Sequence, residues 1–193
     1  MKFLKFAIGG VALAAACAPA IAQSLDSGSA FVDAIRTRDG NKATELLGAH
    51  PNVIDVKDDK GDTALIIAVS RSDEDYTAFL LNRGADPNTA GSGGNTPLIA
   101  AARSGFEQGV AWLLGQGARV DGTNKMGETP LIVAVQHRET AIIKALLAAG
   151  ANPDKTDNAA GYSARDYAAR DNRSRDILKL IEAKKPKPAA AAR

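Results

Sequence analysis

Four aspartates that lie close together in the sequence are the first side chains in this chain that could do chemistry. They are Asp55, Asp58, Asp59 and Asp62. Carboxylate oxygens of this kind are the ligands that calcium prefers. An EF-hand loop counted from Asp55 needs an acid at its third position and Glu at its twelfth, but Lys57 and Ile66 stand there. We therefore expect a solvated loop here and no metal site.

The two histidines are the other residues that suggest metal binding or acid–base catalysis. His50 lies at an expected turn before Pro51, and His137 lies at the end of an expected helix in a different part of the chain. Neither has a second ligand or a nucleophile at a matching spacing. We therefore expect no catalytic residue, no metal and no cofactor, and we expect that the protein is not an enzyme.

A glycine-rich stretch, Gly91-Ser92-Gly93-Gly94, is similar to loops that hold phosphate, and an expected helix follows it. A nucleotide-binding loop ends in Gly-Lys-Ser/Thr or follows a buried strand, and neither feature is present. We expect this stretch to be a flexible tip between two structural units.

The elements that must position these residues recur with a period of about 33 residues. Three kinds of anchor share that period: a threonine that opens each unit, a Leu-Leu pair and a Gly-Ala pair. The threonines are Thr63, Thr96 and Thr129, and the pairs begin at Leu80, Leu113 and Leu146 and at Gly84, Gly117 and Gly150. Independent anchors with one period indicate a stacked helical array, which presents a long surface and does not enclose a reaction centre.

One unit shows how the local sequence makes two helices. Thr129 can accept from the free N–H groups of a first turn and Pro130 has no N–H to lose, which predicts a helix from Pro130 to about His137. An apolar stripe then predicts a second helix from about Thr140 to Ala148. Gly150 follows that helix, where a left-handed residue closes it most easily.

These residues resemble the ankyrin repeat, with its Gly-x-Thr-Pro-Leu start, its Leu-Leu pair and a segment such as Gly84-Ala85-Asp86-Pro87-Asn88 before the hairpin. The resemblance covers residues 29–183 and implies an all-α solenoid of stacked helix-turn-helix units with hairpin or loop fingers. The expected units are an N-terminal capping unit at 29–56, full repeats at 57–88, 89–121 and 122–154, and a C-terminal capping unit at 155–183.

The chain departs from the family pattern at two places. The family usually has histidine after Thr-Pro-Leu, whereas this chain has Ile66, Ile99 and Ile132, so we expect apolar packing in place of a hydrogen bond between repeats. The family also favours glycine at the end of the first helix, and only Gly105 follows this rule. The matching positions, where we expect strained turns or a different geometry, hold Arg38, Ser72, Arg138 and Asn172.

The first 22 residues have the features of a Sec signal peptide. Lys2 and Lys5 precede an apolar stretch, 6–16, which is shorter than the roughly 20 residues that span a bilayer. Small residues then lead to a predicted cleavage site between Ala22 and Gln23, and 23–28 is an expected linker. We therefore expect a periplasmic or secreted protein, from a Gram-negative bacterium, without a membrane span after cleavage.

Cys17 leaves an alternative open, because a lipoprotein signal also places a cysteine at its cleavage point. The residues before Cys17 are alanines, 14–16, and not the Leu-small-small triplet of such signals. Lipid attachment at Cys17 would make the protein a tethered envelope component. If Cys17 is removed, the exported chain has no cysteine and packing alone must hold it.

The charge distribution argues against nucleic-acid binding. Lys2 and Lys5 account for the formal charge of +2, so the chain after residue 22 is neutral. Residues 23–183 are mildly acidic, and the tail 184–193 is basic and rich in Pro and Ala. A nucleic-acid binder needs a basic face. We expect the tail to be a disordered extension, with attachment to an anionic surface as the alternative.

The resemblance places partner binding at the finger tips and on the inner face of the first helices. A residue-for-residue alignment gives Asp59, Lys60, Asp62, Arg71, Ser92, Asn95, Arg103, Ser104, Lys125, Met126, Glu128, Gln136, His137, Tyr162 and Arg170. Arg71, Arg103, His137 and Arg170 lie in or near one row, which favours an acidic partner. We expect a monomer that docks, protects or inhibits another exported protein; a small-molecule-binding or enzymatic protein ranks last among the alternatives.

Overall fold

The computed structural model of the chain describes residues 18–183. This part of the chain folds into ten α-helices and two short 3-10 helices, η1 (Pro51–Val53) and η2 (Ser92–Gly94). The α-helices are α1 (Ala18–Thr37), α2 (Gly40–Ala49), α3 (Ala64–Ser70), α4 (Glu74–Asn82), α5 (Pro97–Ser104), α6 (Glu107–Gly115), α7 (Pro130–His137), α8 (Thr140–Ala148), α9 (Ala164–Arg170) and α10 (Arg175–Ala183). The expected all-α architecture is confirmed.

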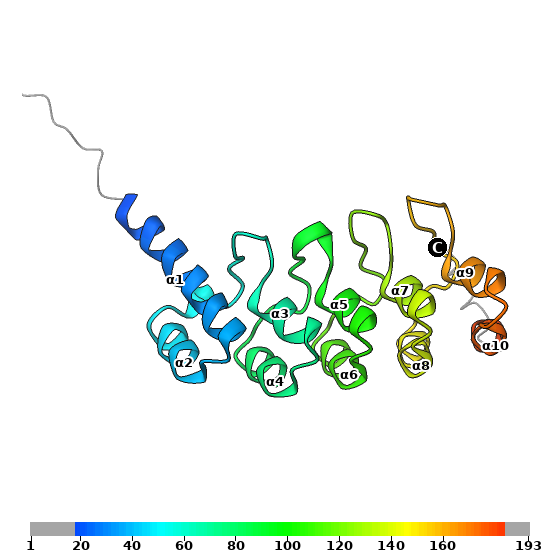
Figure 1. Ribbon diagram of the computed structural model, residues 1–193, viewed down its shortest axis with the longest axis horizontal. Coiled ribbons are helices and arrows are strands. Elements are labelled where there is room, and N and C mark those ends of the chain that lie inside the picture. Colours follow the sequence, from blue (N-terminus) through cyan, green and yellow to red (C-terminus); the bar gives the residue numbers. More distant parts are fainter. Residues whose placement is uncertain (1–17, 184–193) are drawn as a thin grey trace, which may run out of the picture.

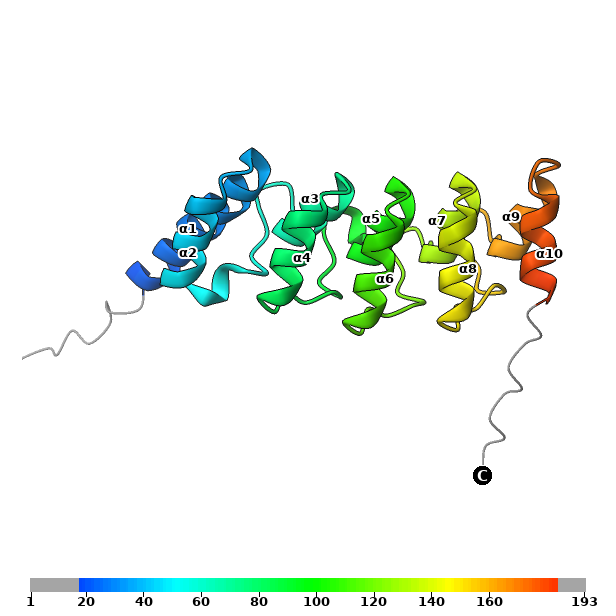
Figure 2. The same cartoon turned by 90° about the horizontal axis from the view of Figure 1, so that it is seen from below.

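The helices form two layers, as Figure 1 shows. The odd-numbered helices α1, α3, α5, α7 and α9 make the inner layer, and the even-numbered helices make the outer layer, which faces the viewer in Figure 2. A long loop before each of α3, α5, α7 and α9 projects on the inner side; we call these loops the fingers, 57–63, 89–95, 122–128 and 155–162. Single antiparallel bridges close the first finger at Lys57 and Thr63 and the last between Thr156 and Ser163.

Threonine caps begin the inner helices as the sequence predicts. The Oγ1 atoms of Thr63, Thr96 and Thr129 accept hydrogen bonds from N–H groups three residues later, at 3.3, 3.2 and 3.1 Å. The bounds of α7 and α8 coincide with the two helices expected in that unit. The closing unit uses a serine, Ser163, in a reciprocal capping box with Asp166.

Apolar contacts join one repeat to the next. Ile99 and Ile132 are buried in the hydrophobic core, so the expected apolar packing at the position of the family's histidine is confirmed there. Ile66 is also buried but lines a cavity on the inner face. Ala68, Ala101 and Ala134 are also buried, on the inner helices α3, α5 and α7, which pack against one another along the stack. A larger side chain at these alanines would separate the helices.

The turns between inner and outer helices confirm the expected strain at three positions. Arg38, Ser72 and Arg138 have φ of 61°, 54° and 60°, in the same left-handed region as Gly105 at 69°. A side chain in this region is unfavourable because its Cβ approaches the following carbonyl oxygen. The last turn has a different geometry: Asp171 ends α9 with φ of −93°, and its carboxylate accepts from the N–H of Arg173 at 3.0 Å.

A ladder of side-chain acceptors runs along the loops that follow the outer helices. The Oδ1 atoms of Asp55, Asn88 and Asp121 accept from main-chain N–H groups of the next repeat. The donors belong to Asp86, Arg119 and Asn152, at 3.0, 2.8 and 3.0 Å. We call these contacts the acceptor ladder, and each of them fixes one repeat to the next.

Some predicted segments lie wholly or largely outside the described residues. These are Cys17, the tail 184–193 and most of the expected signal peptide. The bond between Ala22 and Gln23 and the expected linker 23–28 lie within α1. Between residues 18 and 183, no helix combines the length and the apolar character that crossing a membrane requires.

Replacement of Ser72 by glycine should stabilise the fold, because glycine adopts the left-handed conformation without the steric cost. After subtraction of the entropy of a new glycine in the unfolded chain, we expect Ser72→Gly to raise the free energy of unfolding by about 0.5–1 kcal/mol. Urea denaturation measures the change. Ser70→Gly, in the last turn of α3, is the matched control and should destabilise by a similar amount. Equal destabilisation by both substitutions would contradict strain at Ser72.

Candidate functional site

The surface between the fingers and the inner helices runs along the stack, and we call it the concave groove. A cavity of about 450 Å³ lies in this surface between α3, α5 and the first two fingers. Ile66 and Ala100, both nearly buried, form its apolar floor. Among the residues expected to bind a partner, the structure brings together at this cavity Asp62, Ser92, Asn95, Arg103 and Ser104.

Hydrogen bonds hold neighbouring fingers to one another. The N–H of Ser92 donates to Asp62 Oδ1 at 2.8 Å, which joins the first finger to the second. The N–H of Lys125 in the third finger donates to the Gly93 carbonyl of the second at 3.0 Å. The N–H of Asn158 in the fourth finger donates to the Met126 carbonyl of the third at 2.8 Å. Main-chain contacts of this kind fix the finger tips relative to one another before any partner arrives.

A chain of polar side chains crosses two repeats and ends at Arg103. Asn124 Nδ2 donates to Asn95 Oδ1 at 3.1 Å and to Glu128 Oε2 at 2.7 Å. The same carboxylate oxygen of Glu128 lies 3.5 Å from the Arg103 guanidinium. The side chain of Arg103 is 44 % exposed and that of Glu128 only 12 %, so a nearly buried carboxylate positions a cation that still faces solvent.

Each finger has a residue equivalent to Asn124 that shapes its turn, and this functional position was not identified from the sequence. Asn124 Oδ1 accepts from the N–H groups of Met126 and Glu128 and so closes the turn of its finger. Asp58 and Asp157 do the same in the first and last fingers. In the second finger this position is Gly91, where a Cβ would lie 2.5 Å from Asp62 Oδ1. The spacing of these four residues was the signal available in the sequence.

The acidic cluster of the first finger is structural. Asp55 belongs to the acceptor ladder and Asp62 accepts from Ser92. Burial acts to raise the pKa of Asp58, but hydrogen bonds from the Asp62 N–H, the Arg36 guanidinium and the Lys60 N–H outweigh it and lower the pKa. In residues 18–183 no three carboxylate, histidine or cysteine side chains are grouped closely enough to hold a metal ion.

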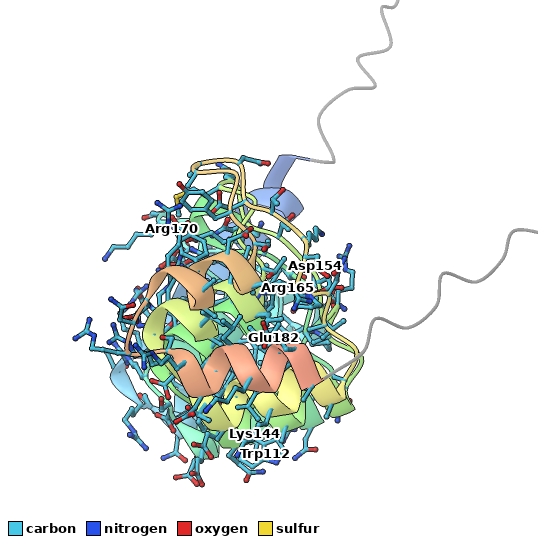
Figure 3. All side chains as sticks on the ribbon, turned by 90° about the vertical axis from the view of Figure 1, so that its right-hand side faces the viewer. Trp112, Lys144, Asp154, Arg165, Arg170 and Glu182 are labelled. Carbon is cyan, nitrogen blue, oxygen red and sulfur yellow. The ribbon has the colours of Figure 1, made fainter. Side chains whose placement is uncertain are left out.

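An aromatic cluster occupies the C-terminal end of the groove. The guanidinium of Arg170 lies 4.4 Å from the centre of the Tyr162 ring, which meets the Tyr167 ring edge to face at 5.6 Å. The Tyr167 hydroxyl donates to Asp157 Oδ2 at 2.6 Å, and this hydrogen bond, together with burial, raises the pKa of Tyr167. Figure 3 shows Arg170 on the opposite side of the stack from Asp154 and Arg165.

Burial acts to raise the pKa of the Asp157 carboxyl, but the hydrogen bonds that it accepts outweigh this effect. The donors are the Tyr167 hydroxyl and the N–H groups of Ala160 and Gly161, followed by that of Tyr162. The net result is a lowered pKa, so the ionised carboxylate holds together both the last finger and the aromatic cluster.

The other expected residues are distributed along the groove. Asp59 and Lys60 are exposed on the first finger, Lys125 and Met126 on the third, and Gln136 and His137 at the end of α7. Met126 is 50 % exposed, the one exposed large apolar side chain in the described part of the chain. Arg71 follows α3 and donates to the carbonyl of Arg36 at 2.6 Å.

Other features lie away from this groove. His50 follows α2 at the N-terminal end of the stack, far along the sequence and the fold from His137. Gly91 to Gly94 form the second finger's turn, with η2 at its tip. Trp112 is half-buried on α6, edge to face with Phe106 at 6.1 Å, and Figure 3 shows it on the same side of the stack as Lys144 of α8.

Comparisons with known proteins agree with this architecture. A family profile described as "Ankyrin repeats (3 copies)" matches residues 31–124 and again residues 110–189. A comparison with curated proteins gives no significant match.

Replacement of Asp157 by asparagine should make stability less dependent on pH. Because the folded state lowers the pKa of Asp157, its carboxylate stabilises the fold above the unfolded value of about 3.9, and this contribution is lost as the pH falls through the folded value. We expect Asp157→Asn to cost about 1–2 kcal/mol at neutral pH, and the difference from wild type should shrink below about pH 4.

Denaturation midpoints measured between about pH 7 and pH 3 test this expectation. Asp59→Asn, at an exposed position of the first finger, is the matched control and should follow the wild type throughout. A deficit of Asp157→Asn that stays constant over the whole range would contradict the role of the charge.

Proposed function

Because this chain belongs to the ankyrin repeat family, we propose that it is an exported binding module that docks another protein in its concave groove. Ankyrin repeats are typically non-enzymatic modules for protein–protein interaction. The finer parts of the proposal, which are export and the use of this groove, rest on the sequence of the N-terminus and on the geometry of the inner face.

The observation that carries the proposal is the preorganisation of the concave groove. Hydrogen bonds join the second finger to the first and the third, and the fourth to the third. Glu128 also holds Arg103 in place from the neighbouring repeat. A surface that is fixed before binding loses little conformational entropy at an interface, and this increases affinity for a complementary partner.

Export is supported by the first 22 residues, where two lysines, an apolar stretch and small residues before Gln23 follow the order of a Sec signal. We propose a periplasmic or secreted location, in which the module protects or inhibits another exported protein. The alternative is a lipid-tethered envelope protein attached through Cys17.

A pull-down from the exported protein fraction of the source cells tests the groove. The bait is the protein as cells process it, and the comparison is a triple variant, Arg103→Ala, Met126→Ala and His137→Ala. We expect a partner captured by the wild type to be lost, with affinity reduced by about 100-fold because three central side chains are truncated. The matched control replaces Arg83, Gln116 and Lys144 by alanine, exposed residues in or just after the outer helices. If the triple groove variant retains the partner and the outer-helix control loses it, the proposal that the partner binds in the concave groove is wrong.

Intact-mass spectrometry of the purified protein tests export. We expect a chain that begins at Gln23, because the small residues before it fit the specificity of signal peptidase. A chain that begins at a lipid-modified Cys17 would support the tethered alternative. A chain that retains Met1 through Ala22 would contradict both.

A further inference from the structure

We propose that the concave groove takes an extended, acidic segment of the partner whose carboxylates recur at every third residue. This inference rests on the proposed function, because it names the chemistry of the partner in the same groove. It is carried by four basic side chains at the ends of the inner helices and by the distance between those helices.

The four basic side chains form a row that we call the helix-end row. Each lies at, next to or just after the last residue of an inner helix: Arg71 at α3, Arg103 at α5, His137 at α7 and Arg170 at α9. The row therefore contains three arginines and one histidine from four successive units. Counted from the capping residue of each inner helix, Arg71 and His137 share one position of the repeat, and Arg103 and Arg170 lie one residue before that position. The partial negative charge at a helix C-terminus stabilises cationic side chains at these positions.

Few carboxylates of the protein pair with the side chains of the helix-end row. Within residues 18–183, no carboxylate oxygen lies within 4.0 Å of the side-chain nitrogens of Arg71, His137 or Arg170. Arg71 uses a backbone carbonyl and Arg170 uses the ring of Tyr162. Arg103 has one carboxylate, Glu128, at the long distance of 3.5 Å.

Several of the nearby acids are engaged with other groups, whereas Asp166 interacts electrostatically with Arg170 and the carboxylate of Glu139 lies beside Gly105. Asp62 accepts from the N–H of Ser92, and Glu128 accepts from Asn124 at 2.7 Å. On the turns, Asp73 pairs with Arg38 at 3.2 Å and Asp171 pairs with Arg138 at 2.8 Å. The charge that the row presents to a ligand is therefore positive, and charge complementarity favours an acidic segment.

The spacing of the row sets the register of such a segment. Neighbouring helices in a packed layer lie about 8–10 Å apart. A polyproline-II chain has about three residues per turn and rises about 3.1 Å per residue, so every third side chain faces the same way at intervals of about 9 Å. Acids at every third position would therefore meet successive members of the row. Small residues between them suit the floor of Ile66 and Ala100.

Labelled synthetic peptides test this inference directly against the protein as cells process it. The probe is a peptide of roughly thirteen residues in polyproline-II conformation, with Glu at every third position, Pro and Ser between, and both ends capped. The reference peptide has the same composition with its glutamates in one block. At about 50 mM salt we expect the periodic peptide to bind at least about fivefold more tightly than the block peptide.

Variants then locate the peptide on the surface. We expect Arg103→Glu to weaken binding of the periodic peptide by about tenfold or more, because it reverses the central charge of the row. Arg83→Glu, at an exposed position after the outer helix α4, makes the same charge change elsewhere and should stay within about twofold of wild type. Equal losses in both variants would mean that only net charge matters and would overturn the inference.

Equal affinity for the periodic and block peptides would also overturn the inference, as would no binding of either peptide. Tighter binding of a peptide with a free C-terminal carboxylate would overturn it as well, because the row would then recognise the C-terminus of a partner chain. The pull-down remains independent of these results. If the pull-down captures a partner through the groove but the protein shows no preference for the periodic peptide, the spacing of acids at every third residue is wrong and the proposed function still holds.

Discussion

Close packing of the inner helices is the contact on which the rest of the structure depends. Each of α3, α5 and α7 carries a small buried residue at the same repeat position, Ala68, Ala101 and Ala134, and no repeat could bury its apolar face without its neighbours. Because these alanines fix the distance between helices, they also fix the spacing of the fingers and of the basic side chains at the helix ends. The geometry of the concave groove thus follows from small side chains that no partner touches.

Much of the fold could be predicted from the sequence because its signals are local. Thr129 and Pro130 define the start of α7 through capping alone, and the bounds of α7 and α8 are those expected. The turns at Ser72 and Arg138 were singled out by one aligned position where glycine is absent, with strain or a different geometry expected, and the structure shows both to be left-handed.

The candidate site was less predictable because its contacts join residues of different types across repeats. Asp58, Gly91, Asn124 and Asp157 share one position, but a glycine, an amide and two carboxylates show no common pattern until their turns are seen. The contact between Arg103 and Glu128 depends on side-chain conformations in two repeats. Its existence could not be predicted from the spacing of either residue within its own unit.

The acceptor ladder also bears on how an array of this kind can gain repeats. Each repeat presents an acceptor, Asp55, Asn88 or Asp121, to the repeat that follows it. At the end of the third full repeat the next residue of this series, Asp154, pairs with Arg165 of α9 at 2.6 Å, a contact that raises the pKa of Arg165. Duplication of a full repeat inside the ladder would preserve every donor and acceptor, because each such repeat supplies one of each. The array can therefore lengthen from within without a new kind of contact.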